Sequence, residues 1–300
     1  MTDSAARSSP RPAPEPAADG SARVGDPRRW LGEVDRRRGL TPEEFWNEYH
    51  LPRKPVVLEG LMDDWRAMEE WSIEFFRTAC ADDEVPVGRC FGPKEQRKLG
   101  SYIDSMHELA DTRGEGPEGK PPLYMEGWYY LHQRPDLADY YSVPEHFGPD
   151  WFYSGSWPFK LDPKPWALLV GPKGAFTKLH HDLWATHSWN AQIVGRKRWI
   201  FVAPDHIDDI YLETRQSGGY VAGTDVERPD LERFPRLAHV PYTTAVVNPG
   251  EMIWFPSMWF HEVESLDDSV SITHNYVSGN IYFRVLGRYL AHRFLKKQSI

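Results

Sequence analysis

Cysteine is scarce in this 300-residue chain, which contains only Cys80 and Cys90. Two cysteines are too few for a disulfide framework, and their spacing matches no metal-binding motif. We therefore expect two reduced thiols and a cytoplasmic protein. No run of about 18 apolar residues occurs and the N-terminus has no apolar signal core, so neither a membrane span nor a secretory signal is predicted.

A surplus of positive charge is also lacking. The formal net charge is −9 at pH 7, which argues against nucleic acid as the main partner, because a phosphate backbone requires a basic surface. The same charge is compatible with a basic substrate. Aromatic residues make up 14% of the chain and prolines number 26. That mixture favours many short strands and loops over a helical bundle.

The chain divides into two parts by composition. Residues 1–28 are rich in Pro, Ala, Ser and charge. We expect them to be a disordered tail, because such a segment buries too little apolar surface to fold. Residues 29–300 are predicted to form a single domain, with an N-terminal α/β lead-in and a C-terminal helix.

Helix signals occur in the lead-in and at the C-terminus. Thr41, Pro42 and Glu44 form a capping-box start, and Ser72 is placed to cap a second helix. A short helix is predicted near residues 102–109, and residues 281–297 repeat apolar positions at helical spacing. The residues predicted to face inward from the first and last helices are Phe45, Trp46 and Tyr49, and Phe283, Leu286, Leu290 and Phe294.

Short apolar segments account for most of the remaining structure. Strands are predicted at 55–58, 85–87, 123–125, 166–170, 244–247, 252–255, 259–263 and 269–277, and within 176–202. The rest of 92–120 and the segments 133–165 and 204–242 are predicted loops. Short antiparallel strands after an α/β lead-in favour a mainly β fold with flanking helices. We expect a double-stranded β-helix, or jelly-roll (cupin) barrel, with room for a ligand between its sheets.

A candidate metal site lies in the stretch 176–202, which contains His180-His181-Asp182. Side chains alternate along a strand, so His180 and Asp182 share one face and His181 points to the other. His261, in the motif Trp259-Phe-His, is the candidate third ligand. Two histidines and one carboxylate on one side of a metal leave coordination positions open, which is the ligand set of non-haem Fe(II) oxygenases.

Other polar residues allow two interpretations each. Ser271, Thr273 and Asn275 share one face of a predicted strand, which faces either solvent or a polar pocket near the metal. Lys197 follows a turn at Gly195, and is either an exposed hairpin lysine or a buried cation that binds an anionic cosubstrate. By alternation His181 and His274 are structural residues, and His187 is left open.

Further motifs recur around these residues. They are Thr177-x-x-His180-x-Asp182, Ser188-Trp-Asn-Ala191, Gly195-Arg-Lys-Arg-Trp199, Pro249-Gly-Glu251, Trp259-Phe-His261 and Ser271-Ile-Thr-His-Asn275. In combination they resemble the Jumonji-C (cupin-like) Fe(II)- and 2-oxoglutarate-dependent oxygenases, from about Leu40 through the C-terminal helix. Gly171-Pro-Lys-Gly174 and His274-Asn-Tyr-Val277 are most similar to the protein lysyl hydroxylase branch.

The resemblance implies roles for individual residues. His180, Asp182 and His261 would be the catalytic iron ligands. Lys197 would pair with the distal carboxylate of 2-oxoglutarate, aided by the Thr177 hydroxyl. The remaining residues implied to contact the cosubstrate are Thr273, Asn275, Asn190 and Tyr124. Lys178 departs from the family, which commonly has Pro after this Thr, and it places a cation at the rim of the site.

The implied function is hydroxylation of a C–H bond with O₂ and 2-oxoglutarate, with a lysine or other basic residue of a protein or peptide as substrate. Acidic residues in loops 133–165 and 204–242 are compatible with a cationic partner. The alternatives are a hydroxylase of a small amino-acid-derived metabolite, a demethylase, a cupin isomerase or hydrolase that does not use 2-oxoglutarate, and a non-enzymatic interaction module. A homodimer through the C-terminal helix is also an expectation.

Overall fold

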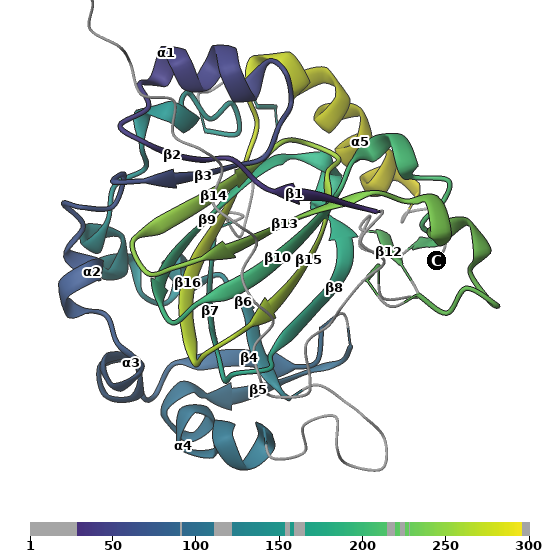
Figure 1. The fold of residues 1–300 in the computed structure, drawn as a ribbon. Coiled ribbons are helices and arrows are strands. Elements are labelled where there is room, and N and C mark those ends of the chain that lie inside the picture. The colour runs from purple at the N-terminus through teal and green to yellow at the C-terminus, as the bar shows by residue number, and fades with distance from the viewer. Residues whose placement is uncertain are drawn as a thin grey trace, which may run out of the picture.

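The computed structural model describes residues 29–90, 92–110, 122–153, 157–158, 166–214, 220–222, 226–227 and 229–295. Two β-sheets dominate the fold, and helices lie around their outer sides (Figure 1). The strand order is β1-β13-β10-β15-β8-β12-β11 in one sheet and β2-β3-β14-β9-β16-β7-β6-β4-β5 in the other. The predicted tail, residues 1–28, lies outside the described residues.

Eight of these strands form a double-stranded β-helix. They are β7 (Trp166–Gly171), β8 (Phe176–His181), β9 (His187–Val194), β10 (Lys197–Val202), β13 (Tyr242–Val247), β14 (Glu251–Phe255), β15 (Phe260–Ser265) and β16 (Ser269–Tyr276). In one sheet they run β13-β10-β15-β8, and in the other β14-β9-β16-β7. Consecutive strands of this set alternate between the two sheets, except that β10 and β13 are in the same sheet. This is the arrangement of a jelly roll. The predicted fold class is confirmed.

The other strands extend both sheets. They are β1 (Trp30–Glu33), β2 (Arg36–Arg38), β3 (Val56–Glu59), β4 (Glu84–Gly88), β5 (Lys94–Lys98), β6 (Tyr124–Trp128), β11 (Leu212–Thr214) and β12 (Tyr220–Ala222). Two predictions are wrong here. Lys94–Lys98 was predicted as loop but pairs with β4. The loop 204–242 contains β12, whose Val221 pairs with His180. Backbone pairing decides both cases, because Lys94–Lys98 has polar side chains without an apolar face and Tyr220–Ala222 is only three residues long.

Alternation along the central strands separates two environments. Trp189 and Trp254 point outward, into a core shared with helices of the lead-in. Trp199, Phe255 and Val263 point inward, into a core shared between the sheets. The residues between the sheets therefore include the polar ones expected to form the site.

Within the described residues, four of the five α-helices lie where sequence signals predicted them, and Arg66–Glu70 was not predicted. The helices are α1 (Pro42–Phe45), continued by a π-helix (Trp46–His50), α2 (Arg66–Glu70), α3 (Ile73–Ala79), α4 (Leu99–Ala110) and α5 (Tyr282–Leu295). Short 3₁₀ helices span Tyr130–His132, Pro135–Tyr140, Glu145–Phe147, Leu183–Ala185, Pro204–His206, Pro235–His239 and Gly279–Ile281. The Thr41–Glu44 capping box is present, and Ser72 accepts a hydrogen bond from the Phe75 N–H. Both caps are confirmed.

Two helix faces differ from prediction. Trp46 is 38% exposed and stacks on His50, whereas Phe45 is fully buried. Phe283 is 83% exposed, because α5 packs through Tyr282, Val285 and Tyr289 instead. In both helices a neighbouring aromatic or β-branched residue occupies the buried face instead of the predicted one.

Both cysteines are buried and free. Within the described residues, no helix is long and apolar enough to cross a membrane.

Candidate functional site

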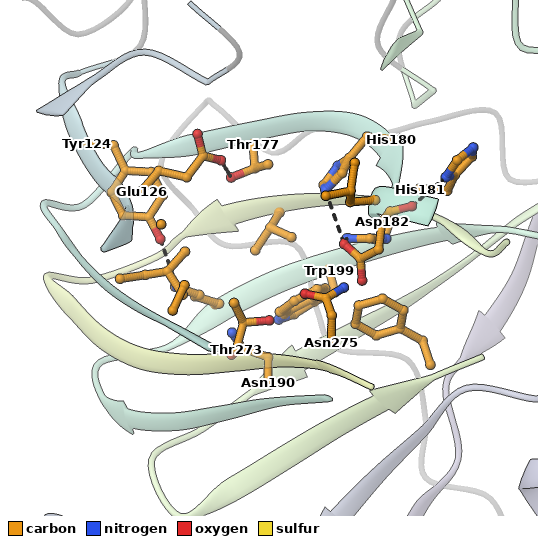
Figure 2. A pocket seen from close by; sticks show the side chains of 18 of the residues that line it. Tyr124, Glu126, Thr177, His180, His181, Asp182, Asn190, Trp199, Thr273 and Asn275 are labelled. Atoms are coloured by element: carbon orange, nitrogen blue, oxygen red, sulfur yellow. Dashed lines mark hydrogen bonds and ion pairs between the residues drawn. The ribbon is translucent and has the colours of Figure 1, made fainter. Parts of the chain in front are cut away.

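A cavity of about 300 Å³ lies between the two sheets. It is lined by Tyr124, Glu126, Gly127, Tyr129, Ala167, Leu169, Thr177, His180, His181, Asp182, Leu183, Asn190, Lys197, Trp199, Phe255, His261, Val263, Thr273 and Asn275. Figure 2 shows most of these side chains projecting from strands of both sheets. All the residues named above as candidate iron ligands or cosubstrate contacts line this one cavity.

Three potential metal ligands meet at one end. His180 and His261 are directly opposite in the β8–β15 register, and Asp182 follows β8 immediately. Asp182 Oδ1 lies 3.8 Å from both His180 Nε2 and His261 Nε2, and one ligand atom of each residue lies within 4.8 Å of the others. Metal bonds to such atoms are about 2.0–2.2 Å, so two donors on one ion lie at most about 4.4 Å apart. The 3.8 Å separations satisfy this limit.

Backbone contacts orient both imidazoles toward the common centre. His180 Nδ1 lies 2.8 Å from the Lys178 carbonyl, and His261 Nδ1 lies 3.4 Å from the Trp259 carbonyl. A carbonyl only accepts, so Nδ1 carries the proton and Nε2 presents a lone pair, as a metal ligand requires. Burial lowers the pKa of His180 to about 4 and that of His261 to about 3. Both are therefore neutral donors near pH 7, and the chemistry of this donor set fits a divalent metal.

The other histidines do not join this group. The His181 imidazole is turned away from the triad (Figure 2), and it packs against Phe260. His187 is buried against Trp254 and accepts a hydrogen bond from the Ser257 N–H. His274 lies beside Asp150. The alternation that assigned His181 and His274 to the opposite face agrees with this placement, and His187 is a core residue.

Thr177 reaches the cavity because β8 is irregular. His180 pairs with His261 but Thr177 pairs with Val263, so three steps along β8 match two along β15. A bulge of this kind shifts the alternation by one residue. Thr177 and His180 therefore both line the cavity, while Lys178 between them is exposed. Simple alternation would have placed Thr177 on the wrong face.

The turn before β10 directs Lys197 inward. Gly195 has φ +70°, and a Cβ there would lie 2.1 Å from the Asp268 carbonyl oxygen, so only glycine fits. Arg196 and Arg198 point outward to Asp267 and Glu227. Lys197, between them, is 2% exposed. The alternative of an exposed hairpin lysine is therefore excluded.

The Lys197 ammonium is held by hydroxyl groups. Its Nζ donates to Ser271 Oγ at 2.6 Å and to Tyr124 Oη at 3.1 Å. Burial lowers the pKa of Lys197 to about 7, opposed by the charge of Glu126. In the described part of the chain, no carboxylate lies within ion-pair distance of this ammonium. A buried cation without a counter-ion fits the carboxylate of a bound anion.

A close approach fixes Tyr124 beside this lysine. A Cβ on Gly171 would lie 2.3 Å from the Tyr124 ring, so only glycine at position 171 leaves room for it. Asn190 and Thr273 face one another across the paired strands β9 and β16. Asn275 donates to Thr186 Oγ1 at 3.0 Å, nearer the metal end. Thr273 and Asn275 therefore line the pocket and Ser271 is buried beside Lys197, so the polar face of β16 does not meet solvent.

Among the lining residues missing from the predicted site are two that strand alternation could have found. Glu126 follows Tyr124 by two positions on β6, and Trp199 follows Lys197 by two positions on β10. The signal for both was the same alternation used for His180 and Asp182. Ser271, recognised only as part of a polar face, is the closest hydrogen-bond partner of Lys197.

Together, the barrel and the cavity define a cupin-type fold with a two-histidine, one-carboxylate group at one end and a buried lysine at the other. The model of the cupin-like domain family matches residues 42–280. The chain belongs to this family, and the resemblance to Jumonji-C oxygenases is confirmed.

Several curated relatives carry more specific names. The 2-oxoglutarate and iron-dependent oxygenase JMJD4 of Gallus gallus is 29% identical over 82% of this chain and 60% of its own length. The arginine-specific demethylase JMJ20 of Arabidopsis thaliana is 27% identical over 83% of this chain and 58% of its own. The lysine-specific demethylase JMJ21 of Arabidopsis thaliana is 31% identical over 82% of this chain and 26% of its own length. The chain thus spans about three fifths of the first two relatives and less of the third.

Proposed function

We propose that this chain is an Fe(II)- and 2-oxoglutarate-dependent oxygenase that hydroxylates a C–H bond. The observation that carries the proposal is the pairing, within one cavity, of the His180, Asp182 and His261 group with the buried ammonium of Lys197. A chelating metal end and a cationic end match the two ends of a 2-oxo dicarboxylate. Relatives named 2-oxoglutarate and iron-dependent oxygenases support it.

Most of the polar residues that line the cavity have a role in this reaction. His180, Asp182 and His261 would hold the iron, which when bound would supply the redox chemistry with O₂. Lys197 would bind the distal carboxylate of 2-oxoglutarate together with Thr177 and Tyr124. The side chains that would orient the cosubstrate between the two ends are Asn190, Thr273 and Asn275. Trp199 and Phe255 form apolar walls that exclude water.

The overall reaction balances without a further reductant. The substrate C–H bond, O₂ and 2-oxoglutarate give C–OH, succinate and CO₂, with one oxygen atom in the alcohol and the other in succinate. The protein positions the C–H bond and keeps water from the centre. His180, Asp182 and His261 would hold the iron, and a set of three protein ligands would leave coordination positions open.

For the substrate we propose a lysine or another basic residue in a protein or peptide. Glu126 and Asp182 are the carboxylates among the lining residues, but Glu126 is ion-paired with Lys94 and therefore supplies no free charge to a substrate cation. Tyr129, 44% exposed at the cavity, offers an aromatic face to an alkyl-ammonium chain. The acidic residues that the structure describes in loops 133–165 and 204–242 are absent from the lining. Relatives named as arginine- and lysine-specific demethylases are compatible with basic residues, and hydroxylation of an N-methyl group would use the same site.

The test is a screen for succinate release with Fe(II) and 2-oxoglutarate, using basic peptides and free amino acids. Mass spectrometry should detect a gain of one oxygen in the active substrate. A lysine peptide should react faster than its norleucine analogue, and added salt should reduce the difference. Equal rates at all salt concentrations would contradict the cationic preference and leave the oxygenase proposal intact.

The rival cupin metalloenzyme would use the same three ligands without 2-oxoglutarate. It gives no role to the buried Lys197, and succinate release dependent on both Fe(II) and 2-oxoglutarate would exclude it. A hydroxylase of a small amino-acid-derived metabolite would instead be found by the free amino acids in the screen.

We further propose that residues 29–300 form a single catalytic domain that acts in the cytoplasm. Dimerisation through α5 is proposed because Phe283 on that helix is 83% exposed. In sedimentation experiments the wild type should be a dimer and Phe283→Ser should be a monomer. A monomeric wild type would contradict dimerisation through α5.

A further inference from the structure

Glu126, on β6, connects Lys94 on β5 to the cosubstrate end of the cavity. Its Oε1 accepts a hydrogen bond from Thr177 Oγ1 at 3.1 Å, the contact drawn in Figure 2. Its Oε2 lies 2.9 Å from Lys94 Nζ on β5. The Glu126 side chain is 18% exposed and that of Lys94 is 25% exposed. A continuous path of charge and hydrogen bonding therefore runs from Lys94 through Glu126 to Thr177.

The hydrogen bond from Thr177 to Glu126 leaves the Thr177 hydroxyl without a proton for a second carboxylate. A threonine hydroxyl has one proton, and an ionised carboxylate only accepts. In the structure that proton is directed to Glu126. The proposed function brings the distal carboxylate of 2-oxoglutarate to the same hydroxyl, where it would meet an oxygen lone pair and a nearby negative charge. Both groups cannot accept the proton at once.

We propose that Glu126 competes with the distal carboxylate of 2-oxoglutarate for the Thr177 hydroxyl, and that cosubstrate binding leaves Glu126 paired with Lys94 alone. This inference rests on the proposed function. Glu126 is then a residue that sets cosubstrate affinity through Thr177, without touching the metal. Lys94 neutralises the competing carboxylate, which would otherwise repel the incoming dianion more strongly.

The variant Glu126→Gln tests the competition. A glutamine retains the shape, removes the charge and can donate its amide hydrogen to Thr177 Oγ1, which frees the hydroxyl proton. Binding is measured by calorimetry with Mn(II) as the metal, at pH 6.5. The probes are 2-oxoglutarate and 2-oxopentanoate, which has the same carbon chain but no distal carboxylate. We expect Glu126→Gln to bind 2-oxoglutarate about tenfold more tightly, equivalent to about 1.4 kcal/mol, and 2-oxopentanoate as the wild type does.

Two further variants complete the test. Glu95→Gln removes an acid next to Lys94 on β5, one that pairs with Arg97 and does not line the cavity, and should change neither affinity. Lys94→Met leaves Glu126 without its cation and should weaken 2-oxoglutarate binding about fivefold. This opposite change keeps the proposal testable if Glu126→Gln folds poorly.

The outcomes are distinct. Unchanged or weaker 2-oxoglutarate binding by Glu126→Gln, or tighter binding by Lys94→Met, would overturn the competition. If wild-type protein does not prefer 2-oxoglutarate over 2-oxopentanoate, the cosubstrate assignment of the proposed function fails, and the competition fails with it.

Discussion

The metal end and the lysine end of the cavity offer opposite chemistry. His180 on β8, Asp182 directly after β8, and His261 on the neighbouring strand β15 present lone pairs. At the lysine end, an ammonium on β10 is held between hydroxyls from β6 and β16. One end is suited to a cation and the other to an anion. The contrast indicates an elongated ligand that chelates a metal at one end and carries a negative charge at the other.

The largest effect is expected from removing a metal ligand. Asp182→Ala should abolish Fe(II)-dependent turnover and lower metal affinity by at least about 100-fold, because the carboxylate supplies the only negative charge of the three ligands. His180→Ala should behave similarly. Metal binding followed by calorimetry, and succinate release, measure both effects.

His181→Ala is the matched control on the same strand. It should cost about 1–3 kcal/mol of unfolding free energy, because the ring is buried, yet leave metal affinity within about threefold. Loss of metal binding in His181→Ala with retention in His180→Ala would reverse the assigned strand faces.

Removing the cation at the other end should act on the cosubstrate alone. Loss of one partner of a desolvated charge pair costs about 2–5 kcal/mol, so Lys197→Ala should raise the 2-oxoglutarate requirement at least about 30-fold. Metal affinity should be unchanged. Arg196→Ala, one residue earlier and paired with Asp267 on the outside, is the control. An unchanged requirement in Lys197→Ala would show that the ammonium does not bind the cosubstrate.

The two ends should also lose function in different pH ranges. Lys197, with a pKa of about 7, must be protonated to bind a carboxylate, so 2-oxoglutarate affinity should fall above pH 7 by up to about tenfold per pH unit. His180 and His261 have pKa values of about 4 and 3. Their protonation therefore opposes metal binding only in acid. Calorimetry from pH 6 to 9 should show falling affinity for 2-oxoglutarate and little change for 2-oxopentanoate; parallel losses would contradict the assignment.

The smallest effect is expected from the support of Lys197. Tyr124→Phe removes one hydrogen-bond acceptor and should raise the 2-oxoglutarate requirement about fivefold. Gly171→Ala should do the same without altering a polar group, because the new methyl group displaces the Tyr124 ring. Gly287→Ala, where a Cβ meets no atom within 4 Å, should have no effect. Wild-type kinetics in Gly171→Ala would show that the tyrosine position is unimportant.

The sequence was more informative about one end than the other. His180 and Asp182 are two residues apart, so strand alternation alone was enough to put them on one face. The jelly roll followed from short apolar strands in the same way. Thr177 faces the cavity only because of the bulge in β8, and no residue type in the sequence predicts that bulge. Its assignment to the site came only from family resemblance. Alternation could have placed Glu126 on the same face as Tyr124. Its contact with Thr177, like that of Ser271 with Lys197, joins strands far apart in sequence, and pairing of that kind is decided by the whole fold.

The central claim is tested most directly by oxygen isotope transfer. Purified protein is incubated under ¹⁸O₂ with Fe(II), 2-oxoglutarate and the active peptide from the screen. The ¹⁸O content of the succinate and of the peptide is then measured by mass spectrometry. The account predicts one ¹⁸O atom in succinate and one in the hydroxylated peptide, with neither product formed by Asp182→Ala. Unlabelled products, or labelled products formed equally well by Asp182→Ala, would contradict it.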